Sequence, residues 1–468
     1  MNFIALKEFC EFVEITFREG SYEQKLYNGL RRGRFRNDRE AQKALYGGQK
    51  HGASYYSQTK TKLKGRLLDA YYSSGIVTEN KGQEKYHKTH QLFCIAEELM
   101  ARGKTQAGAT LMKEALKLSE SIGLLSIATL ATQKLAFYSG TIGSDPKEFL
   151  KYKKAYEGLT KRASVENELR LAYVEVNSYF NTRWRGGKDI FDTANQHLAR
   201  LSSPIVFEDA KLCQIYYNIK AIGLQAISKW ERVIESCDEA IRAILKANPN
   251  APFHLLATFK IMEASSYIQL RKYTKADQMI AEALTRDANV INRQVLNFYL
   301  FISKLNQFDF PAAKKIYSEN QSEVEGMPEK IIENWRIAWA YYAFMASEPV
   351  KVGKLMNELP IYSKDKEGTN FAILVAQVAN YLKEGNRGVV IDRMDSLSRY
   401  KRRYLKNDPR GSAFVTLLSC LVKGSFDLEK VEALSQPALQ CLKSESAISE
   451  IEMVPYEVLW EKVLAMLR

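Results

Sequence analysis

Apolar residues recur at helical spacing through most of the chain. From about residue 90 onward, amphipathic segments alternate with short breaks, including SESIG, GSDPKE, KANPNAP, MPEK and KNDPRG. Apolar positions three and four residues apart form one face of an α-helix, and the alternating Val and Ile runs typical of strands are missing. The pattern predicts an all-α protein built from successive helices of about 12 to 18 residues.

One stretch, LLATFKIMEASSYIQLRKYTKADQMIAEAL, shows the organisation most clearly. Ala264 and Tyr267 precede an Arg-Lys-Tyr turn, and Ala276, Ile280 and Ala283 follow it at spacings of four and three residues. Small residues at a helix crossing allow two antiparallel helices to approach closely. We therefore predict a helical hairpin in which Ala264 and Ala276 lie where the two helices cross.

This hairpin resembles the tetratricopeptide repeat (TPR), whose signature places Trp, Leu, Gly and Tyr on the first helix and Ala, Phe and Ala on the second. Five positions fit that frame: Ala264, Tyr267, Ala276, Ile280 and Ala283. Lys260 and Glu263 replace the tryptophan and the leucine. A preceding copy runs from Tyr217 to Ala240, and weaker ones lie in AEELMARGKTQAGATLMKEAL, FYLFISKLNQFDFPAAKKIY and VANYLKEGNRGVVIDRMDSL.

The resemblance implies a TPR-like α-solenoid, which is a right-handed superhelical array of antiparallel helix pairs with a concave binding surface. A chain of 468 residues also exceeds the usual size of a single core. We expect three regions: a basic N-terminal helical module (1–85), TPR-like helical repeats (86–410) and C-terminal capping helices (411–468).

Composition fits a folded protein, with 46% hydrophobic and 26% charged residues. Charged residues interrupt the apolar positions of the first segment, so we expect no signal peptide. The chain has no apolar run of about 18 residues, so we also expect no membrane span. The six cysteines form no CxxC pair, which favours reduced thiols over a zinc site or a disulfide framework. We expect a cytoplasmic protein.

Candidate catalytic chemistry is sparse. The chain has five histidines and no GxSxG elbow or Ser, His and Asp set that spacing can nominate. Gly103, Lys104 and Thr105 match the end of a phosphate-binding loop, but Glu98 stands where its first glycine is required. We therefore expect no enzyme, no cofactor and no metal site.

Positive charge gathers in two clusters. The net charge of +14 favours acidic partners, and nucleic acid, an acidic protein and an anionic membrane surface all fit. The cationic candidates lie in LRRGRFRNDR and SRYKRRYLKNDPR: Arg31, Arg32, Arg34, Arg36, Arg399, Lys401, Arg402, Arg403 and Lys406. Arginine forks suit phosphates, although a solvated helix face has the same composition. We predict that the stretch from Arg399 to Arg410 is an exposed binding surface.

Aromatic residues are dense in IIENWRIAWAYYAFMA. Trp335, Trp339 and Tyr342 share one helical stripe, which predicts that they pack inside the array. Tyr341 faces elsewhere, so it is a candidate surface residue. Together with Lys260 and Glu263, it is our candidate for the partner-binding groove.

Two functions remain open from the sequence. The first is a non-catalytic scaffold or adaptor that binds a peptide, a helix or an acidic partner through a TPR-like concave surface. The alternative is a nucleic-acid-associated regulator, in which the basic N-terminal module makes the contact and the repeats act as a sensor or dimerisation arm. Neither the partner, the oligomeric state nor the curvature of the array follows from the residues.

Overall fold

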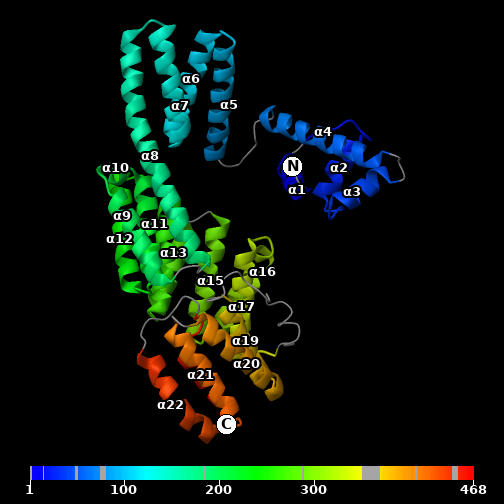
Figure 1. Cartoon of the computed structure of the whole chain (residues 1–468), viewed down its shortest axis with the longest axis vertical. Coiled ribbons are helices and arrows are strands. Elements are labelled where there is room, and N and C mark those ends of the chain that lie inside the picture. The colour runs from blue at the N-terminus through cyan, green and yellow to red at the C-terminus, as the bar shows by residue number, and fades with distance from the viewer. Residues whose placement is uncertain are drawn as a thin grey trace. The chain divides into compact units, whose positions relative to one another are not determined.

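A computed structural model shows that the chain is helical (Figure 1). It describes residues 3–13, 15–47, 51–73, 81–182, 186–286, 289–349, 369–405, 408–444 and 452–467. These ranges contain 22 α-helices and no strand. The prediction of an all-α protein is confirmed.

The chain divides into two compact units, residues 1–164 and 165–468. The division falls within α8 (Pro146–Thr182) and coincides with neither of the boundaries expected after residues 85 and 410. Neither unit contains, among its described residues, a helix both long and apolar enough to cross a membrane.

The first unit begins with four helices that share their own core. They are α1 (Phe3–Phe12), α2 (Tyr22–Arg31), α3 (Asp38–Tyr46) and α4 (Gly52–Ser73). Leu6, Leu26, Leu30, Leu63 and Leu67 are fully buried between them. A second core, around Met112 and Leu135, joins α5 (Lys81–Ala101), α6 (Thr105–Ser121), α7 (Leu125–Thr141) and α8. We refer to α1 to α4 as the N-terminal module.

The second unit is a series of helical hairpins. Its helices after α8 are α9 (Gly187–Leu201), α10 (Pro204–Phe207), α11 (Ala210–Ala226), α12 (Trp230–Ala247), α13 (His254–Gln269), α14 (Tyr273–Arg286), α15 (Val290–Asn306), α16 (Phe310–Val324), α17 (Glu329–Met345), α19 (Thr369–Lys383), α20 (Arg387–Tyr404), α21 (Pro409–Lys423), α22 (Leu428–Ser444) and α23 (Tyr456–Ala465).

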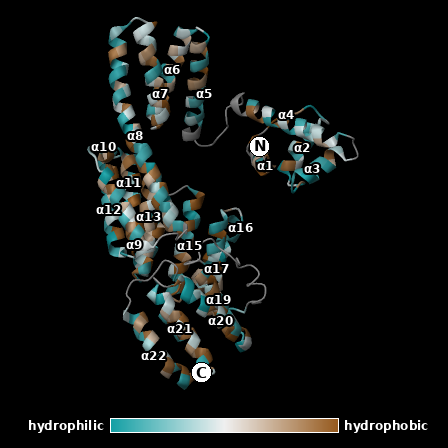
Figure 2. Ribbon diagram, in the orientation of Figure 1, coloured by the Kyte–Doolittle hydropathy of each residue, from teal (hydrophilic) through white to brown (hydrophobic). Residues whose placement is uncertain are grey.

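Consecutive helices pack together as pairs: α11 with α12, α13 with α14, α15 with α16, α19 with α20 and α21 with α22. The first helices of successive hairpins also pack against one another, so that α11, α13, α15, α17 and α19 form an inner row. Hydrophobic and hydrophilic residues are interspersed along these helices (Figure 2).

The same tight turn recurs in this unit. Most of these hairpins have three residues between their helices, and the middle residue has a positive φ. These middle residues are Ser228, Arg271, Phe308 and Gly385. Ser347, the second residue after α17, also has a positive φ. In each turn the following N–H donates to a carbonyl near the end of the preceding helix, as Lys272 N does to Tyr267 O at 2.8 Å. This is the Schellman type of helix end, which usually contains glycine. Only one of the five turns has glycine there, which is why glycine spacing reveals few of the hairpins.

The hairpin predicted around residue 270 is present. Ala264 and Ala276 are fully buried on α13 and α14, which pack together as a pair. Ile280 is also fully buried, and Ala283 is 3% exposed. The small residues therefore lie between helices, where close approach requires them.

Candidate functional site

A cavity of about 340 Å³ lies on the inner row of helices in the second unit. Its apolar wall includes Ile261, Met262, Ile268, Phe298, Ile302 and Ile337. Its polar lining includes Asn181, Thr258, Ser265, Gln269, Lys330 and Asn334. The cavity thus combines apolar side chains with several amide and hydroxyl groups.

Helical spacing explains how these side chains come together. On α13, Thr258, Met262, Ser265 and Gln269 are separated by four, three and four residues, so they share one face. That face turns towards the cavity, whereas Ala264 on another side of α13 is fully buried. One face of α13 therefore lines the cavity, and another face packs in the core.

Ser265 is a deeply buried polar residue of the cavity wall. The residue is 1% exposed, and its hydroxyl oxygen has no hydrogen-bond partner among the residues that the structure describes. A buried hydroxyl without a partner costs about 1 to 3 kcal/mol.

Two charged side chains line the cavity and differ in their surroundings. Lys330, at the start of α17, is exposed and takes part in no ion pair within the described ranges. Glu452 is fully buried and binds Arg410, with Nε to Oε1 at 2.6 Å and Nη2 to Oε2 at 2.9 Å. The charge available to a ligand is therefore the positive charge of Lys330.

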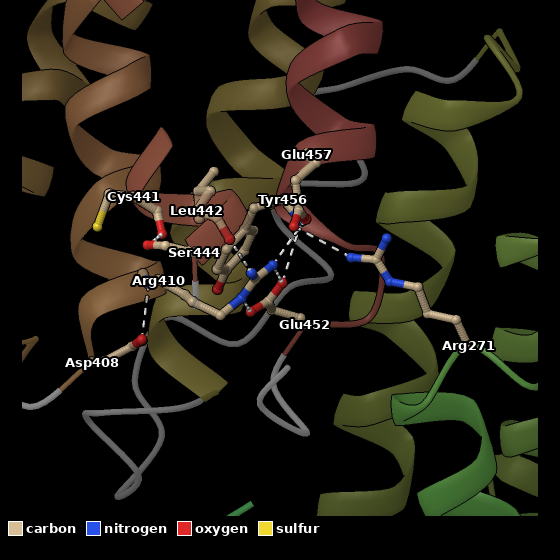
Figure 3. A network of polar contacts seen from close by, with 10 residues as sticks. Arg271, Asp408, Arg410, Cys441, Leu442, Ser444, Glu452, Tyr456 and Glu457 are labelled. Carbon is tan, nitrogen blue, oxygen red and sulfur yellow. Dashed lines mark hydrogen bonds and ion pairs between the residues drawn. The ribbon is translucent and has the colours of Figure 1, made fainter. Parts of the chain in front are cut away.

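Arg410 is the centre of a buried network (Figure 3). Besides Glu452, it binds Glu457 Oε2 at 2.8 Å and donates to the Leu442 carbonyl at 2.7 Å. Arg271, in the turn after α13, reaches the other oxygen of Glu457 at 3.3 Å. Each of the three guanidinium nitrogens thus donates to at least one acceptor, which compensates for the burial of Arg410.

The glutamates of this network respond differently to their surroundings. Burial raises the pKa of Glu452, and the bonds to Arg410 oppose that rise. For Glu457, burial acts in the same direction, but hydrogen bonding to Arg410 and the positive charges of Arg410 and Arg271 outweigh it, so its pKa is lowered. Ionised Glu457 is therefore stabilised by the fold.

The segment that carries both glutamates closes one side of the cavity. We call residues 452–467 the C-terminal strap. Met453 lines the cavity, and its carbonyl accepts a hydrogen bond from Asn306 Nδ2 at 2.8 Å. Lys462 Nζ reaches Ser347 Oγ at 2.9 Å, and Trp460 is 1% exposed. The strap thus contacts the ends of α13, α15 and α17, in addition to the neighbouring C-terminal helices of the expected cap.

Comparison with known proteins adds no assignment. No protein-family model matches the chain, and a search of curated proteins finds no significant similarity. The described residues also contain no group of three or more His, Cys, Asp or Glu side chains arranged to hold a metal ion.

Three predicted groove residues lie outside the cavity lining. Tyr341 is 2% exposed and donates from its hydroxyl to the Ala372 carbonyl at 3.1 Å, so the expectation that it faces the surface is wrong. Glu263 is also 2% exposed, and its Oε2 binds Lys260 Nζ at 2.9 Å. Burial raises the pKa of Glu263 to about 6, although Lys260 opposes the rise. Glu263 and Lys260 form an internal ion pair.

The aromatic stripe on α17 is largely buried. Trp335 and Tyr342 are each 2% exposed, and Trp339 is partly buried. Trp339 stacks on Tyr317, with 4.2 Å between ring centroids, and on Tyr342 at 4.8 Å. α17 also buries Tyr341 because it packs against α15, α16 and α19, which leaves little of its circumference exposed.

The stretch from Arg399 to Arg410 is not one exposed surface. Arg399, Arg402 and Arg403 are exposed, but Lys401 is partly buried and donates to Thr416 Oγ1 at 2.7 Å. Arg410 is buried, so the prediction is wrong for that residue. The acids that bind it, Glu452 and Glu457, are distant in the sequence. Lys406 lies outside the described residues.

The arginines of the N-terminal cluster, in LRRGRFRNDR, are exposed to solvent. Arg31, Arg32, Arg34 and Arg36 are all exposed. Arg31 is held at the edge of the core, where Nη1 donates to the Tyr27 hydroxyl at 3.1 Å.

Sequence reasoning missed the cavity residues Ser265, Phe298 and Lys330. The signal available was weak: Ser265 and Gln269 are polar residues four apart in IMEASSYIQL, which also contains the polar residues Glu263 and Ser266. Such a pair marks a face that is neither core nor fully solvated.

Proposed function

We propose that this protein is a non-catalytic interaction protein that binds an extended peptide segment of a partner in the cavity of its second unit. The observation that supports the proposal most is the cavity itself, with its apolar wall and its row of hydroxyl and amide groups. The TPR resemblance points in the same direction, and a superhelical, TPR-like form of the array is part of the proposal.

The lining suits a peptide in three respects. A volume of about 340 Å³ is within the usual range for ligand pockets. Phe298, Ile302 and Ile337 provide a surface for an apolar side chain, and the carboxamides of Gln269 and Asn334 each offer both a donor and an acceptor. A peptide group presents the same two functions, so an amide can pair with the backbone of a bound segment.

Lys330 defines the preferred charge of the partner. Its ammonium lines the cavity and forms no ion pair with a carboxylate of the described ranges. A ligand with Asp, Glu or a terminal carboxylate next to its apolar residue would satisfy it. Because Glu452 is engaged by Arg410, the lining supports binding better than acid and base catalysis.

The test is selection of peptides by the full chain from a random display library, followed by affinity measurement with the synthetic peptides. Enriched sequences should carry an aliphatic or aromatic residue beside a carboxylate. Lys330→Gln should weaken binding by about 10-fold or more, since it removes a charge-assisted hydrogen bond. Asn334→Trp should block the cavity from a half-buried position without filling the core.

Arg402→Gln is the matched control, because it removes one exposed positive charge elsewhere in the same unit. It should bind the selected peptides like the parent protein. Failure to enrich any peptide, or equal binding by the Asn334→Trp variant, would refute the proposal.

A further inference from the structure

The turn between α2 and α3 holds a group of arginines on a rigid backbone. Gly33 adopts φ +63°, and Arg34 N donates to Gly29 O at 2.8 Å. The ring of Phe35 packs directly against Gly29, where any side chain would overlap it. The backbone of the turn is therefore fixed to α2, and its apolar side chain faces the module.

The start of α3 fixes the other end of this turn. Asn37 Oδ1 accepts from Glu40 N at 2.9 Å, and Glu40 Oε2 accepts from Arg36 N at 2.8 Å. This arrangement resembles a capping box, except that Glu40 accepts from the residue before the N-cap, and it stabilises the first turn of α3. The carboxylate of Glu40 is thereby held on the backbone.

The second acid of the segment is engaged inside the module. Asp38 accepts from Lys60 Nζ at 2.7 Å and from the Tyr56 hydroxyl at 2.6 Å. Burial opposes ionisation of Asp38, but these bonds outweigh it and lower its pKa. The sequence RGRFRNDRE contains two acids that could balance part of its positive charge. Both acids, Asp38 and Glu40, instead bind other groups of the N-terminal module.

The arginine side chains are left facing solvent. Arg32, Arg34, Arg36 and Arg39 are all exposed, and none of them forms an ion pair with another described residue. We call these four residues the arginine turn. A guanidinium is planar, always charged and matched to the geometry of phosphate oxygens.

The absence of an exposed apolar neighbour in the arginine turn narrows the choice of partner. Tight protein interfaces depend on buried apolar or aromatic anchors, and membrane association is strengthened by inserted ones. The only large apolar side chain between Arg32 and Arg39 is Phe35, which packs inward. A surface of arginines alone suits a polyanion whose binding is mainly ionic, and the nucleic-acid backbone is the clearest case.

We propose that the arginine turn binds the phosphate backbone of a nucleic acid without reading its base sequence. The contact is separate from the peptide cavity, so each function can fail without affecting the other.

The test compares two triple variants of the full chain. One variant replaces Arg32, Arg34 and Arg36 with Gln and removes three charges from the arginine turn. The other replaces Arg399, Arg402 and Arg403 with Gln and removes three charges from an exposed part of α20. Affinity for labelled duplex DNA and single-stranded RNA is measured across a salt series, with circular dichroism as the check on folding. Anionic phosphatidylserine vesicles and polyglutamate are the alternative probes.

The parent should bind nucleic acid with a strong dependence on salt. The arginine-turn variant should lose more than 10-fold in affinity at low salt, and its log-log salt slope for duplex should flatten by about 2 to 3. The α20 variant should bind like the parent, and replacing the same three arginines of the turn with Lys should preserve the slope. An equal loss in both triple variants, unchanged binding by the arginine-turn variant, or parental binding only to vesicles or polyglutamate would overturn the proposal.

Discussion

The two arginine-rich segments have similar compositions, but only the second contains a buried arginine, Arg410. In the arginine turn, the local acids Asp38 and Glu40 are engaged by other groups of the module, and the guanidiniums remain exposed. Near residue 410, the local acid Asp408 caps α21 through Gly411 N at 2.8 Å, and Arg410 is buried by two remote glutamates. Local charge balance therefore does not determine whether an arginine is available for binding.

Helix register explains much of the difference. Arg410 lies four residues before Phe414 and seven before Leu417, so it belongs to the buried face of α21. In α20, by contrast, Arg402 and Arg403 lie off the stripe of Val390, Met394 and Leu397. The position of an arginine relative to its apolar stripe is more informative than the number of arginines nearby.

The largest expected effect comes from breaking the buried network. Arg410→Ala should lower the free energy of unfolding by about 3 to 5 kcal/mol, because Glu452 would remain buried without its cation. Chemical denaturation of the parent and the variant measures this difference. Arg402→Ala, the exposed counterpart, should change stability by less than about 0.5 kcal/mol. Similar losses for the two variants would break the comparison.

Removing one carboxylate of the network should have a smaller effect. Glu457→Gln should cost about 1 to 3 kcal/mol at neutral pH, since Arg410 keeps Glu452 but loses a second ionic bond. Because the fold lowers the pKa of Glu457, its contribution is present above pH 4.5, the ordinary value, and is lost as pH falls through the folded value. Denaturation from pH 7 to pH 3 should show the two proteins converging in acid.

Glu263 should show the opposite sign. Its pKa is about 6 in the fold and 4.5 ordinarily, so ionised Glu263 costs stability above pH 6, and that cost is relieved as pH falls towards 4.5. Glu263→Gln should therefore stabilise the protein at pH 7 to 8 by on the order of 1 to 2 kcal/mol. The gain should shrink between pH 6 and pH 4.5 in the same denaturation series. A variant less stable than the parent at pH 8 would show that the ion pair with Lys260 outweighs burial.

The smallest expected effect is at the arginine turn. Arg34→Ala should change the free energy of unfolding by no more than about 0.5 kcal/mol, because the Arg34 side chain is exposed and forms no ion pair within the described ranges. The midpoint of thermal unfolding measures this change. A loss above about 1 kcal/mol would mean that Arg34 stabilises the module, which would weaken its assignment to partner binding.

Helical periodicity was sufficient to predict the all-α fold and the hairpin of α13 and α14. It was not sufficient for Tyr341, because assigning one inner face to α17 ignores helices packed against its other sides. The cavity could not be predicted from any local pattern, because it depends on the spacing of the inner helices and on residues 452 and 453, which pack beside those helices. Arg410 was misassigned for the same reason, since its partners come from the C-terminal strap.

The C-terminal strap has a mechanical consequence. In most helical-repeat arrays each hairpin contacts only its neighbours, so a stretching force can separate them one at a time. Here the strap joins the ends of α13, α15 and α17 through Arg271, Asn306 and Ser347. Tension along this part of the chain would load those bonds and the Arg410 network before the hairpins could move apart. We expect this region to resist extension up to a threshold force and then to yield in a single step.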